Sequence, residues 1–488
     1  MKIGIIGSGF SSLSAACCLA AKGHEVHIFE KNSSIGGRAR KLTESGFTFD
    51  MGPSWYWMPD IFENFFNRFG KSTKDYYELK RLDPGYRIVF GQEDYIDIPA
   101  DFDELCNLFE SIEPDSSNKL IKFLDEAEYK YKVGIGDFVW RPSLSITEFL
   151  DLRIVKSLFA LQMFSSISSE IRSKFKNEKL VKLLEFPVIF LGATPKNTPA
   201  LYSLMNYADL KLGTWYPQGG MFKVVEGMSS LATELGVQFH LSHNVDQILV
   251  DNGVCKGLSV NGDNIYFDKV VAGSDYHHTE QNLLDSKYRL YSPKKWEKIT
   301  MAPSSLLFYI GVKGNIPEFI HHTLFFDRDF EKHAKEIYDQ PKWPTEPLLY
   351  LSCTSKTDST VAPPHHENLV VLIPLAPNLE DNEEIRSKYF EIFLSRMKEI
   401  YGLELSDRIV YKKSYCINDF KSDYNAFKGN AYGLANTLLQ TAFLKPKMKN
   451  NKVKNLYFTG QLTVPGPGVP PTIISGQVVA DLILNEIM

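Results

Sequence analysis

The sequence predicts an α/β fold, and three features of the 488-residue chain lead to that prediction. A short apolar run, Lys2 to Ile6, is followed by a glycine-rich turn and by a helix of small residues that Gly23 ends. A second apolar run finishes at Glu30 and completes a strand–helix–strand unit of about 30 residues. Residues 456–459, 460–471 and 473–484 have the pattern of a strand, a loop dense in glycine and proline, and a closing helix. We therefore expect a Rossmann-like parallel sheet whose strands come from distant parts of the chain.

The composition is that of a large globular protein. Hydrophobic residues make up 44% and charged residues 23% of the chain, and the length suits two or three units. The net charge of −5 gives no electrostatic footprint for nucleic acid, and no run of about 18 apolar residues predicts a membrane span. Six cysteines without C-x-x-C spacing indicate neither a zinc site nor a disulfide framework. Because Met1 and Lys2 lead directly into the first strand, we expect no secretory signal and a cytoplasmic location.

The first turn carries an incomplete G-x-G-x-x-G fingerprint, which reads Gly7, Gly9 and Ser12. Gly7 permits the tight turn and Gly9 lets a pyrophosphate approach the backbone, whereas the third glycine only lets helix and strand pack closely. Ser12 therefore replaces the glycine whose role is steric. Glu30 follows Gly9 by 21 residues, where a carboxylate can accept the hydroxyls of an adenosine ribose. These residues predict a working dinucleotide site.

The residues after Glu30 distinguish between the possible dinucleotides. Gly36, Gly37 and Arg38 stand at a loop-to-helix corner, where N–H groups and a cation can reach a pyrophosphate from the side opposite Gly9. This E-K-x(4)-G-G-R extension resembles the two-dinucleotide-binding flavoproteins, which share a glutathione-reductase-like FAD domain. No second fingerprint follows a strand, so we expect no NAD(P) domain and expect oxygen or a quinone as the electron acceptor.

Five segments from both ends and the centre of the chain sharpen this resemblance. They read "GSGFSSLSAACCLAAKGHEVHIFEKNSSIGGRA", "GFTFDMGPSW", "WYPQGGM", "LSHNVDQI" and "NLYFTGQLTVPGPGVPP". In these segments the chain resembles bacterial carotenoid desaturases, the phytoene-desaturase-like branch of the amine-oxidase-type flavoproteins. The resemblance implies a glutathione-reductase-type FAD domain made of residues 1–95, 213–280 and 450–488. It also implies a mixed α+β substrate-binding domain made of residues 96–212 and 281–449, with a helical lid near 141–212.

The resemblance further implies which residues hold FAD. The pyrophosphate turn and the adenosine ribose would be contacted by Gly7, Ser8, Gly9, Phe10, Ser11, Glu30 and Lys31. Gly37, Arg38 and Gly460 would flank the diphosphate, and the backbone of Val245 would meet the adenine. The isoalloxazine would lie beside Met51, Gly52, Pro53, Ser54, Gly468, Val469 and Pro470. The chain departs from the family pattern at Ser12, Gln461 and Val464.

The implied reaction is FAD-dependent removal of a hydride and a proton from adjacent carbons of a C40 polyene, in carotenoid biosynthesis. Both phytoene-type substrates and a 1′-hydroxy-carotenoid desaturated at C3–C4 fit, because these sister activities share the motifs. A hydrocarbon offers few polar groups, so we expect a long hydrophobic tunnel, lined by residues 153–172 and 183–210. Core packing is the simpler explanation for the apolar spacing of Leu158, Leu161, Phe164 and Ile167, and a membrane-contacting lid helix is the alternative. Since the substrate resides in a bilayer, we expect peripheral membrane contact.

No motif marks an acid–base residue. Glu185, inside an apolar run, is a weak candidate for a carboxyl with a raised pKa, and a carboxylate on a helix surface is the simpler explanation. The histidine pairs at 277–278, 321–322 and 365–366 have no carboxylate at ligand spacing. We therefore expect solvated histidines and no metal site.

Three other functions fit parts of the sequence. An FAD amine oxidase would share the cofactor domain and act on a cationic amine, but "WYPQGGM" and "PGPGVPP" favour the polyene branch. A non-catalytic lipid-binding module, like the escort proteins of prenylated GTPases, would have lost FAD, and the retained Gly7, Gly9 and Glu30 argue against it. An FAD-dependent isoprenoid isomerase or saturase is compatible with every motif.

Overall fold

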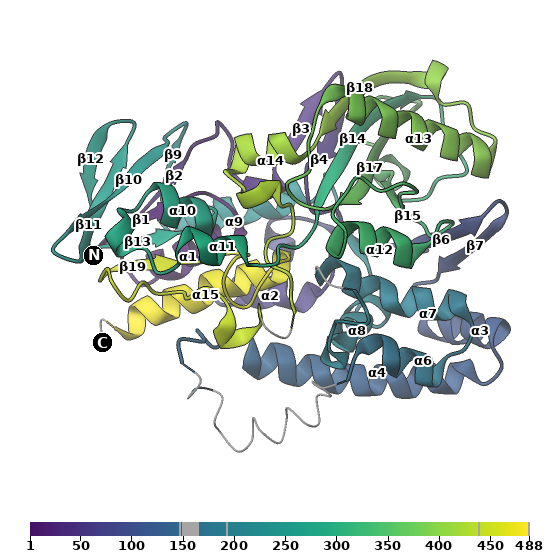
Figure 1. Cartoon of the computed structure of the whole chain (residues 1–488), viewed down its shortest axis with the longest axis horizontal. Helices are drawn as coiled ribbons and strands as arrows, with labels where there is room; N and C mark the ends of the chain where they lie inside the picture. Colours follow the sequence, from purple (N-terminus) through teal and green to yellow (C-terminus); the bar gives the residue numbers. More distant parts are fainter. Residues whose placement is uncertain (146–147, 149–164, 192–193, 438–439, 487–488) are drawn as a thin grey trace.

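A computed structural model describes residues 1–145, 148, 165–191, 194–437 and 440–486 of the chain. Its first layer is a five-stranded sheet of order β19-β13-β1-β2-β9, in which every neighbouring pair is parallel. The strands are β1 (Lys2–Ile6), β2 (Glu25–Glu30), β9 (Gln238–Leu241), β13 (Lys269–Ala272) and β19 (Leu456–Phe458). They come from both ends and the middle of the chain, and both termini lie beside this sheet (Figure 1). The predicted α/β class and the convergence of distant segments are confirmed.

Helices α1 (Phe10–Ala20), α9 (Phe222–Glu234) and α15 (Val469–Asn485) pack together over this sheet. Gly476 allows α15 to approach α1, because a Cβ there would lie 2.2 Å from the carbonyl oxygen of Ser11. Gly273 provides the space at Ser12, because a Cβ on Gly273 would lie 2.0 Å from the Ser12 hydroxyl. Gly273, the residue after the neighbouring strand β13, therefore provides the space that the third glycine of the fingerprint would otherwise provide. The helix α15 begins at Val469 and not at Ile473 as predicted, because proline is tolerated in a first helical turn.

Smaller elements complete this half of the molecule. β10 (Val245–Asp251), β11 (Val254–Val260) and β12 (Asp263–Tyr266) form an antiparallel three-stranded sheet. β3 (Lys41–Glu44) pairs with β4 (Phe47–Asp50), and β5 (Leu79–Arg81) pairs with β8 (Trp215–Pro217). The remaining helices here are α2 (Pro59–Asn67), α10 (Tyr276–Asn282) and α11 (Pro293–Glu297).

A seven-stranded mixed sheet forms the second layer, with the order β18-β14-β17-β16-β15-β6-β7. Its strands are β6 (Tyr86–Gly91), β7 (Asp94–Ile98), β14 (Ser304–Lys313), β15 (His322–Phe325), β16 (Leu349–Ser352), β17 (His366–Leu375) and β18 (Ile409–Tyr415). The long helix α13 (Glu383–Tyr401) covers one face through Phe390, Phe393 and Met397. The helices α12 (Phe330–Tyr338) and α14 (Ile417–Tyr424) also belong to this half.

A helical region lies below the seven-stranded sheet in Figure 1. It contains α3 (Phe102–Ile112), α4 (Ser116–Val133), α6 (Ile167–Lys174), α7 (Glu178–Glu185) and α8 (Leu204–Leu210). The predicted lid near 141–212 falls partly here, and its residues 146–147, 149–164 and 192–193 lie outside the described residues. Leu158, Leu161 and Phe164 are among these, whereas Ile167 is fully buried in the core. Within the described residues, no helix is both long and apolar enough to cross a bilayer.

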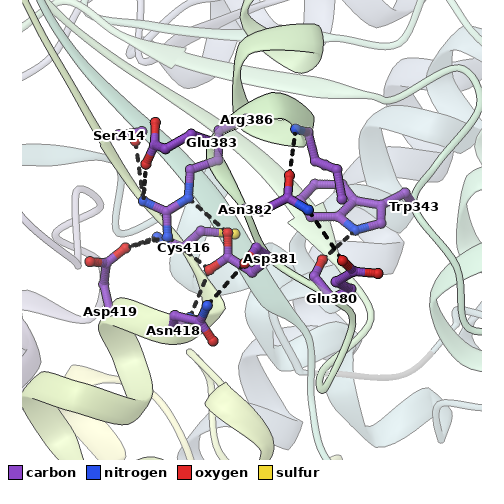
Figure 2. A network of polar contacts seen from close by, with 11 residues as sticks. Trp343, Glu380, Asp381, Asn382, Glu383, Arg386, Ser414, Cys416, Asn418 and Asp419 are labelled. Carbon is purple, nitrogen blue, oxygen red and sulfur yellow. Dashed lines mark hydrogen bonds and ion pairs between the residues drawn. The ribbon is translucent and has the colours of Figure 1, made fainter.

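The start of α13 is fixed to β18 and α14 by a network of polar contacts around Arg386 (Figure 2). The Arg386 guanidinium donates two hydrogen bonds to Asp381, at 2.7 and 2.8 Å, and one to Asp419 at 2.7 Å. It also reaches the Ser414 hydroxyl at 3.2 Å. Asp381 in turn accepts a hydrogen bond from the backbone N–H of Asn418. Hydrogen bonding to Asp381 raises the pKa of Arg386, so this buried charge is fully compensated within the protein.

Candidate functional site

One cavity of about 470 Å³ lies between the two sheets. It opens at the carboxyl ends of β1, β2, β13 and β19, which is where parallel α/β sheets bind ligands. All eighteen residues that the sequence predicts to bind the cofactor line it. They are Gly7, Ser8, Gly9, Phe10, Ser11, Glu30, Lys31, Gly37, Arg38, Met51, Gly52, Pro53, Ser54, Val245, Gly460, Gly468, Val469 and Pro470. Their role in binding stays a prediction, but the fold brings them to one place.

Neither the backbone conformation nor the packing at position 9 requires a glycine, so the open space there is available to a ligand. Gly9 has extended backbone angles that any residue adopts, and a Cβ added to it would meet nothing within 4 Å. Gly37 faces it, because a Cβ on Gly37 would lie 3.3 Å from the Gly9 Cα. Gly9 is also the N-cap of α1, which has neither a side-chain cap nor an acidic residue in its first turn. The helix N-terminus therefore presents free N–H groups and its positive dipole end to the cavity, as a pyrophosphate requires.

Arg38 is a half-buried cation in the cavity wall with little compensation from the protein. Its Nη2 lies 3.4 Å from the carbonyl oxygen of Asn430, and its guanidinium carbon lies 5.3 Å from the ring centre of Tyr424. When the amide oxygen of Gln461 faces it, that oxygen lies 3.3 Å from both terminal nitrogens. The Arg38 Nε has no hydrogen-bond partner among the described residues. Burial lowers the pKa of Arg38 and Asp275 opposes that shift, so an anion in the cavity would satisfy this side chain.

Glu30 stands at the end of β2 as predicted, and protein groups surround its carboxylate. One oxygen accepts from the Ser8 backbone N–H at 3.0 Å and from the Ser8 hydroxyl at 2.7 Å. The other accepts from the backbone N–H and the side-chain amide of Asn32, at 2.9 and 3.0 Å. Since a carboxylate accepts about four hydrogen bonds, a ribose must displace one of these donors. The Ser8 hydroxyl and the Asn32 amide can rotate away, because they belong to side chains.

Two helix N-termini position the segments predicted to lie beside the isoalloxazine. Asp50 accepts the backbone N–H groups of Met221 and Phe222, at 2.7 and 3.0 Å, and so ties α9 to the start of the segment 51–54. The other terminus is that of α15, where Val469 is followed by two prolines without N–H groups. Val469 is therefore the backbone donor in this first turn.

Lys445 holds the loop that precedes α15. Its buried ammonium group donates to the carbonyl oxygen of Pro465 at 2.7 Å and to the Asn436 side chain at 2.8 Å. Burial lowers the pKa of Lys445 to about 7.

The other end of the cavity is apolar and is built by the seven-stranded sheet, by α12 and by the helical region. The residues there include Trp55, Trp57, Met58, Phe186, Met205, Leu324, Phe326, Phe330, Ile337, Leu348 and Leu372. From the two stretches predicted to line a tunnel, the described lining residues are Phe186, Thr194, Pro195 and Met205. Among the described lining residues, the carboxylates are those of Glu30, Asp275 and Asp423, and all three lie on the nucleotide side.

Sequence reasoning missed the elements that complete this cavity. Ser274 and Asp275 follow β13. Their position at the carboxyl end of a parallel strand could have predicted that they line the ligand site. Tyr424 and Asp423 end α14, and the face of α12 from Phe330 to Tyr338 lines the apolar end. Nothing in the local sequence of α12 or α14 marks them, because their position depends on the seven-stranded sheet.

The structure places Glu185 in a protein contact. It accepts a hydrogen bond from the Ser168 hydroxyl at 2.5 Å and lies 3.6 Å from the Arg172 side chain. Burial raises the pKa of Glu185, as predicted, and Ser168 opposes that shift. Phe186, and not Glu185, lines the cavity. Its place outside the described lining residues gives no support to a role of Glu185 in the chemistry.

The expectation of solvated histidines is wrong for one pair. His321 and His322 are buried, and burial lowers the pKa of both, so they are uncharged. His322 stacks on Trp55 with ring centres 4.2 Å apart, and its Nδ1 lies 2.7 Å from the Tyr350 hydroxyl. His322 begins β15, which lies between β6 and β16 inside the seven-stranded sheet, and this position explains its burial. Among the described residues, no three His, Cys, Asp or Glu side chains gather as a metal site.

Comparison with known proteins gives the same picture. The family model of flavin-containing amine oxidoreductases matches residues 10–484. The chain belongs to this family. It is 42% identical to the carotenoid 3,4-desaturase of Haloarcula japonica over 484 residues, which are 99% of this chain and 98% of that protein. It is 33% identical over 499 residues to a 4,4′-diapophytoene desaturase of Staphylococcus haemolyticus, covering 100% of this chain and 99% of that protein.

Within the family, the chain is therefore of the carotenoid desaturase type. It is an oxidoreductase, and its cofactor is FAD. Solved structures share its fold at low identity. An oxidoreductase from Methanosarcina mazei superimposes with a TM-score of 0.65 at 16% identity, covering 99% of this chain and 100% of that one. A putrescine oxidase variant does so with a TM-score of 0.64 at 12% identity, covering 99% of both chains.

Proposed function

We propose that the chain is an FAD-dependent carotenoid desaturase that introduces a double bond into a C40 polyene during carotenoid biosynthesis. One observation carries the proposal: a single cavity joins the dinucleotide residues to an apolar chamber. The chemistry that FAD supplies when bound is acceptance of the two hydrogens lost by adjacent carbons, one as a hydride and one as a proton. The protein must therefore bind both molecules, orient them and exclude water.

At the nucleotide end, the chain binds and fixes the cofactor. The N–H groups of α1 and the guanidinium of Arg38 would hold the pyrophosphate from two sides. Glu30 would accept the ribose hydroxyls after the Ser8 or Asn32 side chain turns away. Ser54 and the Val469 N–H would meet the isoalloxazine, so these residues would hold the reacting part of the cofactor beside the apolar chamber.

At the apolar end, the chain binds the polyene by excluding water from it. The aromatic and aliphatic side chains of Trp55, Phe186 and Phe326 provide contacts without any charge. Since no carboxylate is among the described residues of this chamber, the proposal assigns the chain no general base. Its contribution to rate is then the orientation of the two reactants in a dry site.

The relative that is 42% identical to this chain and is named for 3,4-desaturation supports the proposed substrate class. We favour a carotenoid oxidised at C3–C4, including one with a hydroxyl at C1, over phytoene. We also propose a cofactor domain of residues 1–95, 213–280 and 450–488 and a substrate-binding domain of residues 96–212 and 281–449. The hairpin β6–β7 spans the boundary at residue 95, because both of its strands belong to the seven-stranded sheet. Peripheral membrane contact, near 141–212, would give access to a bilayer-dissolved substrate, and oxygen or a quinone would accept the electrons.

The test is conversion of defined carotenoids by the FAD-loaded protein in liposomes, with products separated by chromatography. We expect a product with a longer conjugated chain and a new C3–C4 double bond. Putrescine serves as the substrate for the amine oxidase alternative, and an isomer of unchanged hydrogen content would reveal an isomerase. A purified protein that binds no flavin, or that leaves every carotenoid unchanged, would contradict the proposal.

A further inference from the structure

The helix α12 places an isolated polar group in the apolar chamber. Its residues Phe330, Ala334, Ile337 and Tyr338 line the cavity along one face. The Tyr338 hydroxyl is buried and has no hydrogen-bond partner among the described residues. Arg38 Nε, at the nucleotide end of the same cavity, shares this property. Buried polar groups nearly always have partners, so an orphaned one that lines a cavity indicates a ligand group.

The position of Tyr338 is fixed by the rest of its helix. His333, one turn earlier, places one ring nitrogen 3.0 Å from the carbonyl oxygen of Pro374, and its other nitrogen accepts from the Leu348 N–H at 3.1 Å. Burial lowers the pKa of His333 to about 4, so it is neutral in this arrangement. Glu336 accepts both the N–H and the hydroxyl of Thr345. These contacts hold α12 against the sheet, and the phenol of Tyr338 is held in place with it.

The neighbours of Tyr338 connect it to the flavin side of the cavity. Burial raises the pKa of Tyr338 and the phenol of Tyr432 adds to that shift, so the two side chains are within electrostatic range. Tyr432 also lines the cavity and acts in the same way on Tyr350. Burial raises the pKa of Tyr350, and its hydroxyl lies 2.7 Å from the Nδ1 of His322. Tyr338, Tyr350 and Tyr432 thus line one cavity together with the segment 51–54, which we expect beside the isoalloxazine.

We propose that Tyr338 determines substrate specificity by hydrogen bonding to a hydroxyl on the end group of the carotenoid. The inference rests on the proposed function. A hydroxyl at C1 is separated from C3 by one methylene, so a group that binds it must lie close to the reacting bond. Tyr338 and Ser54 line the same cavity, so one ligand that fills it can reach both. The raised pKa keeps Tyr338 neutral, so its hydroxyl can donate to or accept from an alcohol.

The energetic consequence distinguishes this role from packing. A hydrocarbon end group would leave the Tyr338 hydroxyl buried and unpaired, whereas a hydroxylated end group would pair with it. Sites built around such a pair discriminate strongly against the analogue that lacks the hydroxyl. We expect the wild-type protein to bind the hydroxylated carotenoid at least about tenfold more tightly than its hydrocarbon counterpart.

The experiment compares a carotenoid with a tertiary hydroxyl at C1 and the unhydroxylated carotenoid of equal chain length and conjugation. Binding to the FAD-loaded protein is measured by quenching of tryptophan fluorescence, since Trp55 and Trp57 line the cavity. Conversion of each substrate is measured in parallel. The variant Tyr338→Phe removes only the hydroxyl. Tyr401→Phe, on α13 and outside the lining residues, is the matched control.

We expect Tyr338→Phe to lose at least about tenfold in affinity and in kcat/KM for the hydroxylated substrate, and to be equal or improved for the hydrocarbon, because no hydroxyl is left unpaired. Tyr401→Phe should retain the wild-type preference. Equal losses on both substrates, or no loss, would overturn the role of Tyr338. If Tyr338→Phe does not fold, the preference of the wild type decides, because equal binding of the two substrates also overturns it. Conversion of neither substrate by the wild type would instead contradict the proposed function.

Discussion

Two arginines in this molecule, Arg386 in a buried network and Arg38 in the cavity wall, have opposite surroundings. Arg386, at the start of α13, has its guanidinium paired with two carboxylates and a hydroxyl, and these contacts raise its pKa (Figure 2). Arg38, in the cavity, has one long hydrogen bond to a carbonyl, an amide oxygen at 3.3 Å and an Nε with no partner among the described residues, and burial lowers its pKa. The contacts of Arg386 are therefore completed by the fold, whereas those of Arg38 are not.

The contrast separates residues that the fold needs from residues that a ligand needs. Around Arg386, polar atoms meet partners supplied by the chain itself. In the cavity, polar groups and open space remain where no packing requirement explains them, as at Arg38 Nε, the Tyr338 hydroxyl and Gly9. Substitutions in the first region should therefore change stability, and substitutions in the second should change binding.

The largest effect should come from Arg386→Met, which leaves the fully buried carboxylate of Asp381 without its ion-pair partner. Removal of one partner from a buried ion pair typically costs about 3–5 kcal/mol, because the other charge is left uncompensated. We expect this loss in chemical unfolding followed by circular dichroism. FAD content per folded molecule should be unchanged. A variant of wild-type stability would show that the network contributes nothing to the fold.

Gly9→Ser should abolish cofactor binding without harming the fold. Serine is a favourable N-cap and the backbone angles at Gly9 suit it, so the apoprotein should unfold at or above the wild-type temperature. The added side chain occupies the space for the pyrophosphate, so FAD affinity should fall at least about 100-fold, or about 2.7 kcal/mol.

The control for Gly9→Ser is Gly91→Ser, whose Cβ also meets nothing within 4 Å but lies outside the cavity. It should bind FAD normally. Normal flavin absorbance in Gly9→Ser would mean that Gly9 does not face the cofactor.

Much of the nucleotide end was predictable from the sequence, because its signals are local. Gly7, Gly9 and Glu30 lie within one strand–helix–strand unit, and the turn, the helix terminus and the strand end follow from short-range geometry. The space at Ser12 was not predictable, since Gly273 supplies it from a strand more than 250 residues away. The same holds for α12 and for the burial of His322, which depend on the pairing of β15 with β6 and β16.

Arg38→Met should have the next largest effect on cofactor binding. Hydrogen bonds to charged groups contribute about 1.5–3 kcal/mol, so FAD affinity should fall about 10- to 100-fold. The unfolding temperature of the apoprotein should be equal or higher, because a poorly compensated buried charge is removed. Titration of the apoprotein with FAD, followed by flavin fluorescence, measures the first effect. A strong loss of apoprotein stability would instead show that Arg38, like Arg386, stabilises the fold.

Lys445 lies between the two classes, since its partners are protein groups but it borders the loop before α15. Its pKa of about 7 in the fold lies below the value of about 10.4 for an unfolded chain. Between these values the unfolded state binds the additional proton, so stability should rise with pH, by at most about 1.4 kcal/mol per pH unit. Unfolding of the wild type and of Lys445→Met from pH 6 to pH 10 tests this. The variant should lose that slope, and identical slopes would contradict the assignment.

The smallest effect should come from Ser12→Ala. The Ser12 hydroxyl is buried without a partner among the described residues, and alanine is the better helix former. We expect a gain of about 1 kcal/mol in stability and unchanged FAD content. A loss of FAD would show that Ser12 takes part in binding and does not merely fill the space beside Gly273.

The central claim is that one cavity holds FAD at its polar end and a polyene at its apolar end. The most direct measurement is a crystal structure of the FAD-loaded protein soaked with a carotenoid. We predict density for the pyrophosphate over the adjoining backbones of Gly9 and Gly37 beside Arg38, the isoalloxazine at Met51–Ser54, and the polyene along α12. A flavin bound elsewhere, or a carotenoid that does not reach the isoalloxazine, would contradict the account.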